Sequence, residues 1–167
     1  MEYKTYGKRE GMSREECSAG VIAYCQDSER GKRLYLMLQY PSGYWDFPKG
    51  RLENNESSLE AAVRELKEEA NIEVKLEGKF EYTVSYDFRD RDGMLVHKKV
   101  TFFVGKALSD DVMLSNEHEQ FAWLSLGDAL KLLTYHNARQ VLQLADQFLD
   151  MQSTEQEQEA GEKTLTP

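Results

Sequence analysis

The segment GRLENNESSLEAAVRELKEEANI, residues 50–72, crowds Glu65, Glu68 and Glu69 into little more than one helical turn beside one arginine, Arg64. Like charges at neighbouring helical positions repel one another and destabilise an isolated helix. Another interaction must offset that repulsion, unless the three carboxylates simply lie on a solvated face. The interpretation of the rest of the sequence depends on which interaction offsets this repulsion.

The apolar residues of the same segment have the spacing of an amphipathic helix. At about 100° per residue, Glu69 lies about 40° to one side of Glu65 and Glu68 about 60° to the other, so the acids share one face. The predicted core stripe, about 120° away, consists of Leu59, Ala62, Val63, Leu66 and Ala70. The acids are therefore expected at the edge of this stripe, with Ser57 or Ser58 as the N-cap.

The charge balance of the helix favours a bound cation. Arg64 precedes Glu68 by four residues, so the two can pair, and a guanidinium can hold one carboxylate in a bidentate contact. The remaining carboxylate oxygens are ligands that suit Mg²⁺ or Mn²⁺, and such a cation is a Lewis acid for phosphate chemistry. We therefore predict a divalent-cation site here, although geometry alone leaves a solvated acidic face as the alternative.

The composition of the 167-residue chain suits one globular domain. Apolar residues make up 40%, enough for a core. The net charge of −9 and the pI near 4.9 argue against loose binding to nucleic acid or anionic membranes, which needs a basic patch. The net negative charge is still compatible with a phosphorylated substrate, because a bound cation can reverse the local electrostatic field.

Neither a targeting segment nor a disulfide framework is apparent. The first sixteen residues, MEYKTYGKREGMSREE, contain no apolar stretch of the kind a signal peptide has, and no apolar run approaches the length of a membrane span. Cys17 and Cys25 are expected to be free thiols. We therefore predict a cytoplasmic protein without a membrane segment.

Alternation, apolar runs and turn residues predict a mixed sheet flanked by helices, an α+β fold. Extended segments are expected at residues 18–25, 34–40, 44–50, 72–88, 94–108 and 121–126. Residues 127–151 have helical spacing and predict one or two helices with a break near Tyr135. The predicted organisation is a flexible arm at 1–16, one domain at 17–150 and a disordered polar tail at 151–167.

The spacing of the acidic segment resembles the Nudix box of the Nudix hydrolases. The matching positions are Gly50, Glu56, Arg64, Glu65, Leu66, Glu68, Glu69 and Ile72. One position departs from the pattern, because Asn71 stands where a glycine is expected before Ile72. Asparagine tolerates the left-handed backbone better than other non-glycine residues, so a helix C-cap is still expected.

The resemblance implies a fold and a set of roles. Nudix hydrolases cleave a nucleoside diphosphate linked to another group, with divalent metal and a water nucleophile, and they are α/β/α sandwiches with a mixed sheet. The implied metal-binding and water-activating acids are Glu65, Glu68 and Glu69, with Glu56 as a supporting metal-binding acid and Arg64 as their orienting partner. The carbonyl of Lys49 or Gly50 would add a backbone ligand. The identity of the general base varies across the family and stays open.

Segments outside the box resemble the asymmetrical diadenosine tetraphosphate hydrolases, which release ATP and AMP. These segments are YWDFPKG, SYDF, KKVTFFVGKA and LSNEHEQFAWLSL. In that group a loop acid joins the helix acids, and Glu117 holds the matching place; an ordinary loop acid is the alternative. His118 is expected to be a hydrogen-bonded loop residue, with a role in assisting Glu117 as the alternative. Phe102 stands where an adenine-stacking tyrosine is common, and it keeps the stacking face without the hydroxyl.

Four further residues are candidates for substrate binding. Lys49 is expected near the phosphates. Alternation along the strand allows either Lys98 or Lys99, but not both, to face the site. Tyr86 could bond a phosphate or only pack, and Trp45 could lie under the substrate or in the core.

The combined pattern predicts a monomeric hydrolase that acts on a small dinucleoside polyphosphate with Mg²⁺ or Mn²⁺. Two alternatives stay open. An RNA 5′ pyrophosphohydrolase or decapping enzyme could use the same box, which handles only the pyrophosphate, although the net charge of −9 opposes a long RNA partner. A Nudix-fold binding module without catalysis usually has a broken box, whereas all the acids are present here.

Overall fold

The computed structural model describes residues 13–163, with side chains up to residue 160. Within these residues, seven strands form one mixed sheet in the order β3-β2-β1-β6-β5, with β4 on β1 and β7 on β2. The strands are β1 (Ser13–Gln26), β2 (Arg33–Gln39), β3 (Trp45–Asp46), β4 (Lys49–Arg51), β5 (Val74–Arg89), β6 (Leu95–Ala107) and β7 (Gln120–Leu124). β1 and β6 pair in parallel and the other pairs are antiparallel.

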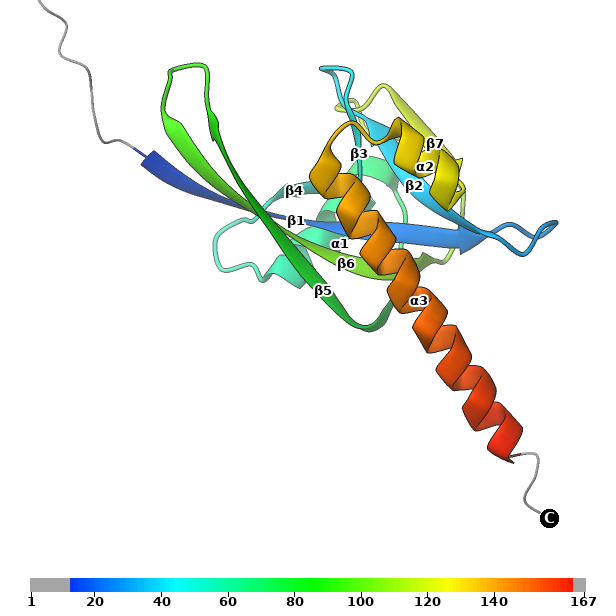
Figure 1. Ribbon diagram of the computed structural model, residues 1–167. Coiled ribbons are helices and arrows are strands. Elements are labelled where there is room, and N and C mark those ends of the chain that lie inside the picture. Colours follow the sequence, from blue (N-terminus) through cyan, green and yellow to red (C-terminus); the bar gives the residue numbers. More distant parts are fainter. Residues whose placement is uncertain (1–12, 164–167) are drawn as a thin grey trace, which may run out of the picture.

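Helices cover both faces of the sheet, as Figure 1 shows with α3 in front and α1 behind. The helices are α1 (Ser58–Ala70), α2 (Leu126–Leu132) and α3 (His136–Lys163). Alternate residues of β1 point to opposite faces: Ile22 packs with α2 and α3, whereas Val21 packs with α1. The predicted α/β/α sandwich with a mixed sheet is confirmed, as is the break between the last two helices near Tyr135.

Both ends of α1 have the predicted caps. The Ser57 hydroxyl accepts a hydrogen bond from the Glu60 N–H, and the Glu60 carboxylate accepts one from the Ser57 N–H at 2.8 Å, which forms a capping box. At the other end Asn71 has φ 55° and ψ 30°, and its N–H donates to the Lys67 carbonyl. Asparagine therefore supplies the left-handed C-cap in place of glycine.

The buried face of α1 differs from the predicted stripe. Leu59 and Val63 are 37% and 38% exposed, whereas Ala61 and Glu69 are buried. The face is rotated towards the acids because β4 and the loop before β7 cover that side. The N–H of Ser115 in that loop donates to the Glu69 carbonyl. The prediction that the acids lie at the edge of the core is confirmed for Glu69, which is 4% exposed.

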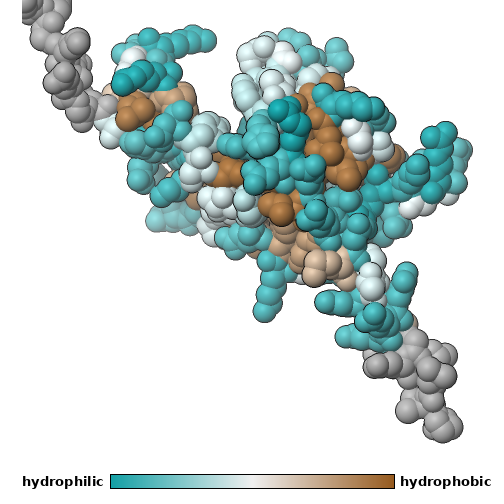
Figure 2. Space-filling model, viewed as in Figure 1, coloured by the Kyte–Doolittle hydropathy of each residue, from teal (hydrophilic) through white to brown (hydrophobic). Residues whose placement is uncertain are grey.

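The predicted ends of the domain are wrong within the described residues. Residues 13–16 belong to β1, because the parallel ladder with β6 runs from Ser13↔Leu95 to Tyr24↔Lys106. Residues 151–163 continue α3 rather than forming a disordered tail, since glutamine and glutamate are good helix formers. Residues 151–160 of α3 extend away from the domain and are mostly hydrophilic (Figure 2). The rest of the predicted arm and tail, 1–12 and 164–167, lies outside the described residues.

None of the helices in residues 13–163 combines the length and the apolar character that a membrane span requires. Cys17 and Cys25 are free thiols, as predicted.

The capping box gives a test of how α1 is stabilised. Ser57→Ala should lower the free energy of unfolding by about 1 kcal/mol, because the Glu60 N–H loses its acceptor. Urea denaturation of the two proteins measures this difference. Ser58→Ala is the matched control, since Ser58 is the first helical residue and not the cap. Equal losses in the two variants would contradict the assignment of the cap.

Candidate active site

Arg64 on α1 joins three of the predicted metal-binding acids. Its guanidinium donates to both carboxylate oxygens of Glu56 at 2.7 and 2.9 Å, to Glu65 at 2.9 Å and to Glu68 at 3.1 Å. The predicted pairing with Glu68 is present, but the bidentate partner is Glu56. Hydrogen bonding from Arg64 lowers the pKa of Glu56 to about 2, so this carboxylate stays ionised at neutral pH.

Glu65 lies directly against the backbone of β4. A Cβ atom added at Gly50 would fall 2.1 Å from the Glu65 carboxylate. Only glycine lets strand and carboxylate approach this closely. Burial raises the pKa of Glu65, against the opposing effect of Arg64. Glu65 is therefore held at a defined position and is easier to protonate than an exposed glutamate.

Glu69 belongs to a second cluster at the buried edge of α1. One of its carboxylate oxygens accepts a hydrogen bond from the Lys49 N–H at 3.1 Å, and the other lies 3.1 Å from His118 Nε2. Ligand atoms of Glu69, Glu117 and His118 all lie within 4.8 Å of one another. The structure thus brings Glu117 to Glu69, as expected of a loop acid that joins the helix acids.

His118 differs from the expected hydrogen-bonded loop residue. Its side chain is buried and its ring packs edge-on against Tyr40 at 4.4 Å between centroids. Neither ring nitrogen has a hydrogen-bond partner among the described residues, although Nε2 is within ion-pair distance of Glu69. An unpartnered buried imidazole beside two carboxylates is a donor set that fits a divalent cation.

Strand β4 separates the acids from a cavity on the other face of the sheet. The backbone N–H of Lys49 contacts Glu69, whereas its ammonium lies 3.2 Å from Asp46 and 4.3 Å from the centre of the Tyr40 ring. The Lys49 side chain lines this cavity. Lys49 and Gly50 are therefore shared by the acid clusters and the cavity.

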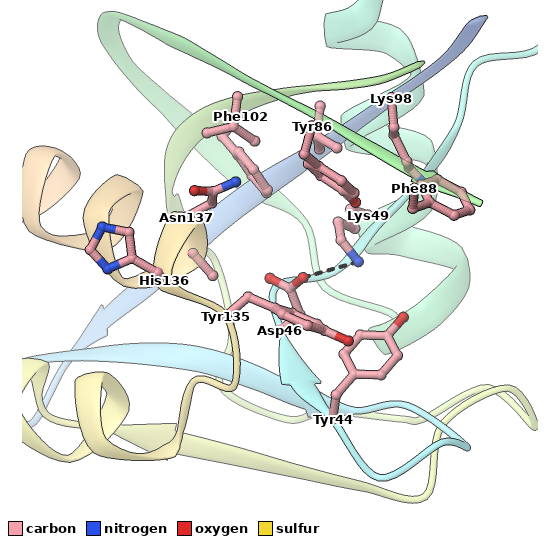
Figure 3. Close-up of a pocket in the computed structure, with 13 residues that line it drawn as sticks. Tyr44, Asp46, Lys49, Tyr86, Phe88, Lys98, Phe102, Tyr135, His136 and Asn137 are labelled. Atoms are coloured by element: carbon pink, nitrogen blue, oxygen red, sulfur yellow. Dashed lines mark ion pairs between the residues drawn. The ribbon is translucent and has the colours of Figure 1, made fainter. Parts of the chain in front are cut away.

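The cavity has a volume of about 610 Å³ and is lined mainly by aromatic and basic side chains (Figure 3). Its lining residues are Tyr44, Asp46, Lys49, Val84, Tyr86, Phe88, Lys98, Val100, Phe102, Tyr135, His136, Asn137 and Ala138. These side chains come from β3, β4, β5, β6, the start of α3, and the residues just before β3 and α3. A cavity of this size that combines aromatic rings with a few charged groups suits a nucleotide.

Four of the five predicted substrate-binding residues line the cavity: Lys49, Tyr86, Lys98 and Phe102. Trp45 does not; it packs against the core, and its backbone N–H donates to the Thr134 hydroxyl at 3.0 Å. Alternation along β6 allowed only one of Lys98 and Lys99 to face the site, and Lys98 is the one that lines the cavity. Burial lowers the pKa of Lys98, while Glu16, whose carboxylate lies 3.8 Å away, opposes this effect.

Residues 18–145 match the family described as NUDIX domain. This chain belongs to the Nudix family. The Nudix domain shares 32% identity over 136 residues with an asymmetrical bis(5′-nucleosyl)-tetraphosphatase of Caenorhabditis elegans, which covers 79% of this chain and 95% of the relative. It shares 34% identity over 122 residues with the enzyme of the same name from Sus scrofa, which covers 69% of this chain and 80% of the relative.

The solved structures agree with the sequence relatives. The crystal structure of a C. elegans Ap4A hydrolase binary complex matches with a TM-score of 0.72 and 33% identity, over 81% of this chain and 98% of the other. The chain is therefore a Nudix hydrolase that most resembles the asymmetrical tetraphosphatases. Enzymes of this family generally use divalent metals, which agrees with the acidic clusters on α1.

Sequence reasoning missed several residues of the Nudix site. Glu16, assigned to a flexible arm, is a buried carboxylate 2.8 Å from Arg51 and close to Lys98. Its register partner on β6 is Lys98, so an extended strand 13–26 would have revealed the pair. Asp46 and Asn137 also line the cavity. Asn137 carries no local signal, because only the packing of α3 on the sheet brings the start of this helix to the cavity.

Gly50 tests whether the position of Glu65 matters for turnover. In Gly50→Ala the new methyl group should displace the Glu65 carboxylate, which is the end of a side chain, rather than unfold the strand. A displacement of about 1 Å can cost about 10²-fold in rate. We expect a loss of that order in kcat with little change in the unfolding midpoint, measured by steady-state kinetics and urea denaturation.

Gly127→Ala is the control, because a Cβ atom there has no neighbour within 4 Å. A Gly50→Ala protein as active as Gly127→Ala would show that the contact with Glu65 is not needed for turnover.

Proposed function

We propose that this protein hydrolyses diadenosine tetraphosphate asymmetrically to ATP and AMP, with Mg²⁺ or Mn²⁺ bound by the acids of α1. The observation that carries the proposal is the double role of Lys49. Its backbone holds Glu69 of the acid cluster, and its side chain lines the nucleotide-sized cavity. A nucleotide in the cavity would therefore extend its phosphates past β4 to the acids. The names of the relatives from C. elegans and Sus scrofa support this substrate class.

The acids Glu65, Glu68, Glu69 and Glu117, with Glu56 in support, are the proposed metal ligands, and the carbonyl of Lys49 or Gly50 would complete the set. A bound divalent cation neutralises phosphate oxygens and lowers the pKa of water. Fixed oxygens near a buried histidine are ligands that divalent metals accept. A divalent cation fits this site because carboxylate oxygens are suitable ligands and because the buried ring nitrogens of His118 have no hydrogen-bond partner among the described residues.

Side chains of the protein would bind the substrate and accept the proton of the attacking water. Lys49 and Lys98 would neutralise phosphate charge at the cavity, Tyr86 would bond a phosphate, and Phe102 would stack on the base. Water attacks a phosphorus, its oxygen forms the new P–O bond, and the bridging P–O bond to the leaving ATP breaks. Glu65 and Glu69 are the carboxylates held in position to accept the proton of that water.

The relatives do not favour the alternative of an RNA 5′ pyrophosphohydrolase. A binding module without catalysis is also not favoured, because every acid of the box is present and placed around α1. We also propose that the protein is a monomer in the cytoplasm. Its two free thiols suit a reducing compartment, and a net charge of −9 favours solubility.

Product analysis tests the proposal. With Mg²⁺ or Mn²⁺, chromatography should show equal amounts of ATP and AMP from diadenosine tetraphosphate. Cleavage of this substrate should be faster than cleavage of nucleotide sugars, capped RNA or triphosphorylated RNA. Release of two ADP molecules, or faster release of pyrophosphate from triphosphorylated RNA, would contradict it.

Glu69→Gln should abolish turnover while the protein stays folded, because the side chain keeps its size and loses its charge. Circular dichroism checks the fold of this variant. Unchanged turnover in Glu69→Gln would remove Glu69 from the metal-binding set.

A further inference from the structure

The cavity has two chemically different ends. Among the lining residues, Val84, Val100, Phe102 and Ala138 belong to one apolar cluster and form an apolar end. Asp46 and Lys49, which form an ion pair, and Lys98 make up a charged end beside β4. A nucleotide bound as proposed above would place its base at the apolar end and its phosphates at the charged end. This orientation rests on the proposed function, since the acids of α1 lie beyond β4.

Asn137 is the uncharged amide among the lining residues and belongs to the first turn of α3. In Figure 3 its side chain points into the cavity beside Phe102. Its amide group has no hydrogen-bond partner among the described residues. By contrast, the charged lining groups are engaged, because Asp46 pairs with Lys49, and Lys98 lies near Glu16. Asn137 is therefore free to bond a ligand.

We propose that Asn137 recognises the edge of the base and thereby favours adenine over guanine. An amide presents one donor group and one acceptor. The Watson–Crick edge of adenine offers the N6 amino donor and the N1 acceptor, and its Hoogsteen edge offers N6 and the N7 acceptor. Asn137 can satisfy both polar groups on either edge.

Guanine leaves a polar group unmet on either edge. Its Watson–Crick edge has three groups, O6, N1–H and the N2 amino group, of which one amide meets two. Its Hoogsteen edge has two acceptors, O6 and N7, of which the single amide donor group meets one. An unmet polar atom against Val84, Val100 and Ala138 is costly, because those side chains offer it no partner.

Replacing the amide with a carboxylate should reverse this preference. In Asn137→Asp both oxygens accept, so adenine can donate from N6 alone and its ring nitrogen faces a negative charge. Guanine can donate from both N1–H and the N2 amino group. Asn137→Ala removes both hydrogen-bonding groups, so the affinities for adenine and guanine nucleotides should become nearly equal.

The test compares affinities for AMP and GMP without any divalent ion, by NMR titration, and then kcat/KM for diadenosine and diguanosine tetraphosphate. We expect AMP to bind the unaltered protein about tenfold more tightly than GMP, which is the scale of one bidentate contact. The ratio should approach one in Asn137→Ala and favour GMP in Asn137→Asp. The ratio of kcat/KM values should move in the same direction.

Gln140→Glu is the control, since it adds the same charge at an exposed position of α3. It should leave the AMP to GMP ratio unchanged. The proposed role of Asn137 would be overturned if the AMP to GMP affinity ratio were the same in the unaltered protein and in Asn137→Asp. It would also be overturned if the unaltered protein bound AMP and GMP with equal affinity. Because binding of AMP and GMP needs no turnover, failure to cleave diadenosine tetraphosphate would count against the proposed function alone.

Discussion

The guanidinium of Arg64 is the interaction on which the acidic helix depends. It binds Glu56 from the preceding loop and Glu65 and Glu68 from α1 itself, and it also donates to the Arg51 carbonyl at 3.0 Å. One cation thus compensates carboxylates that would otherwise repel one another and fixes the loop before the helix. One positive charge cannot neutralise three negative ones, so the site keeps an excess of negative charge.

The acids form two groups, according to whether or not Arg64 binds them. Arg64 holds Glu56, Glu65 and Glu68, whereas Glu69 is turned into the protein, where the Lys49 N–H and the ring of His118 approach it. β4 runs between this cluster and the aromatic cavity, and Gly50 gives room for Glu65. The arrangement brings the charge needed for phosphate chemistry next to a cavity that fits a base, with a single strand between them.

Local signals in the sequence were sufficient to predict α1 and its caps, because Ser57, Glu60 and Asn71 act on neighbouring backbone. Helical spacing predicted one shared face for Glu65, Glu68 and Glu69, but it did not predict that Glu69 would be turned away from Arg64 towards Lys49 and His118. Contacts distant in sequence were harder to predict. Leu59 and Val63 are exposed because a loop covers the opposite side of α1, and residues 13–16 are ordered because β6 pairs with them. Asn137 reaches the cavity through the packing of α3 on the sheet, which no local pattern encodes.

The most direct test of the central claim is a Mn²⁺ titration followed by electron paramagnetic resonance, because it detects the cation that the crowded acids require. The intact protein should bind Mn²⁺, and the double variant Glu69→Gln, Glu117→Gln should bind it at least about tenfold more weakly. Glu155→Gln, an exposed change on α3, should bind as the intact protein does. Absence of Mn²⁺ binding by the intact protein with a nucleotide analogue present, or equal affinity in the double variant, would contradict the account.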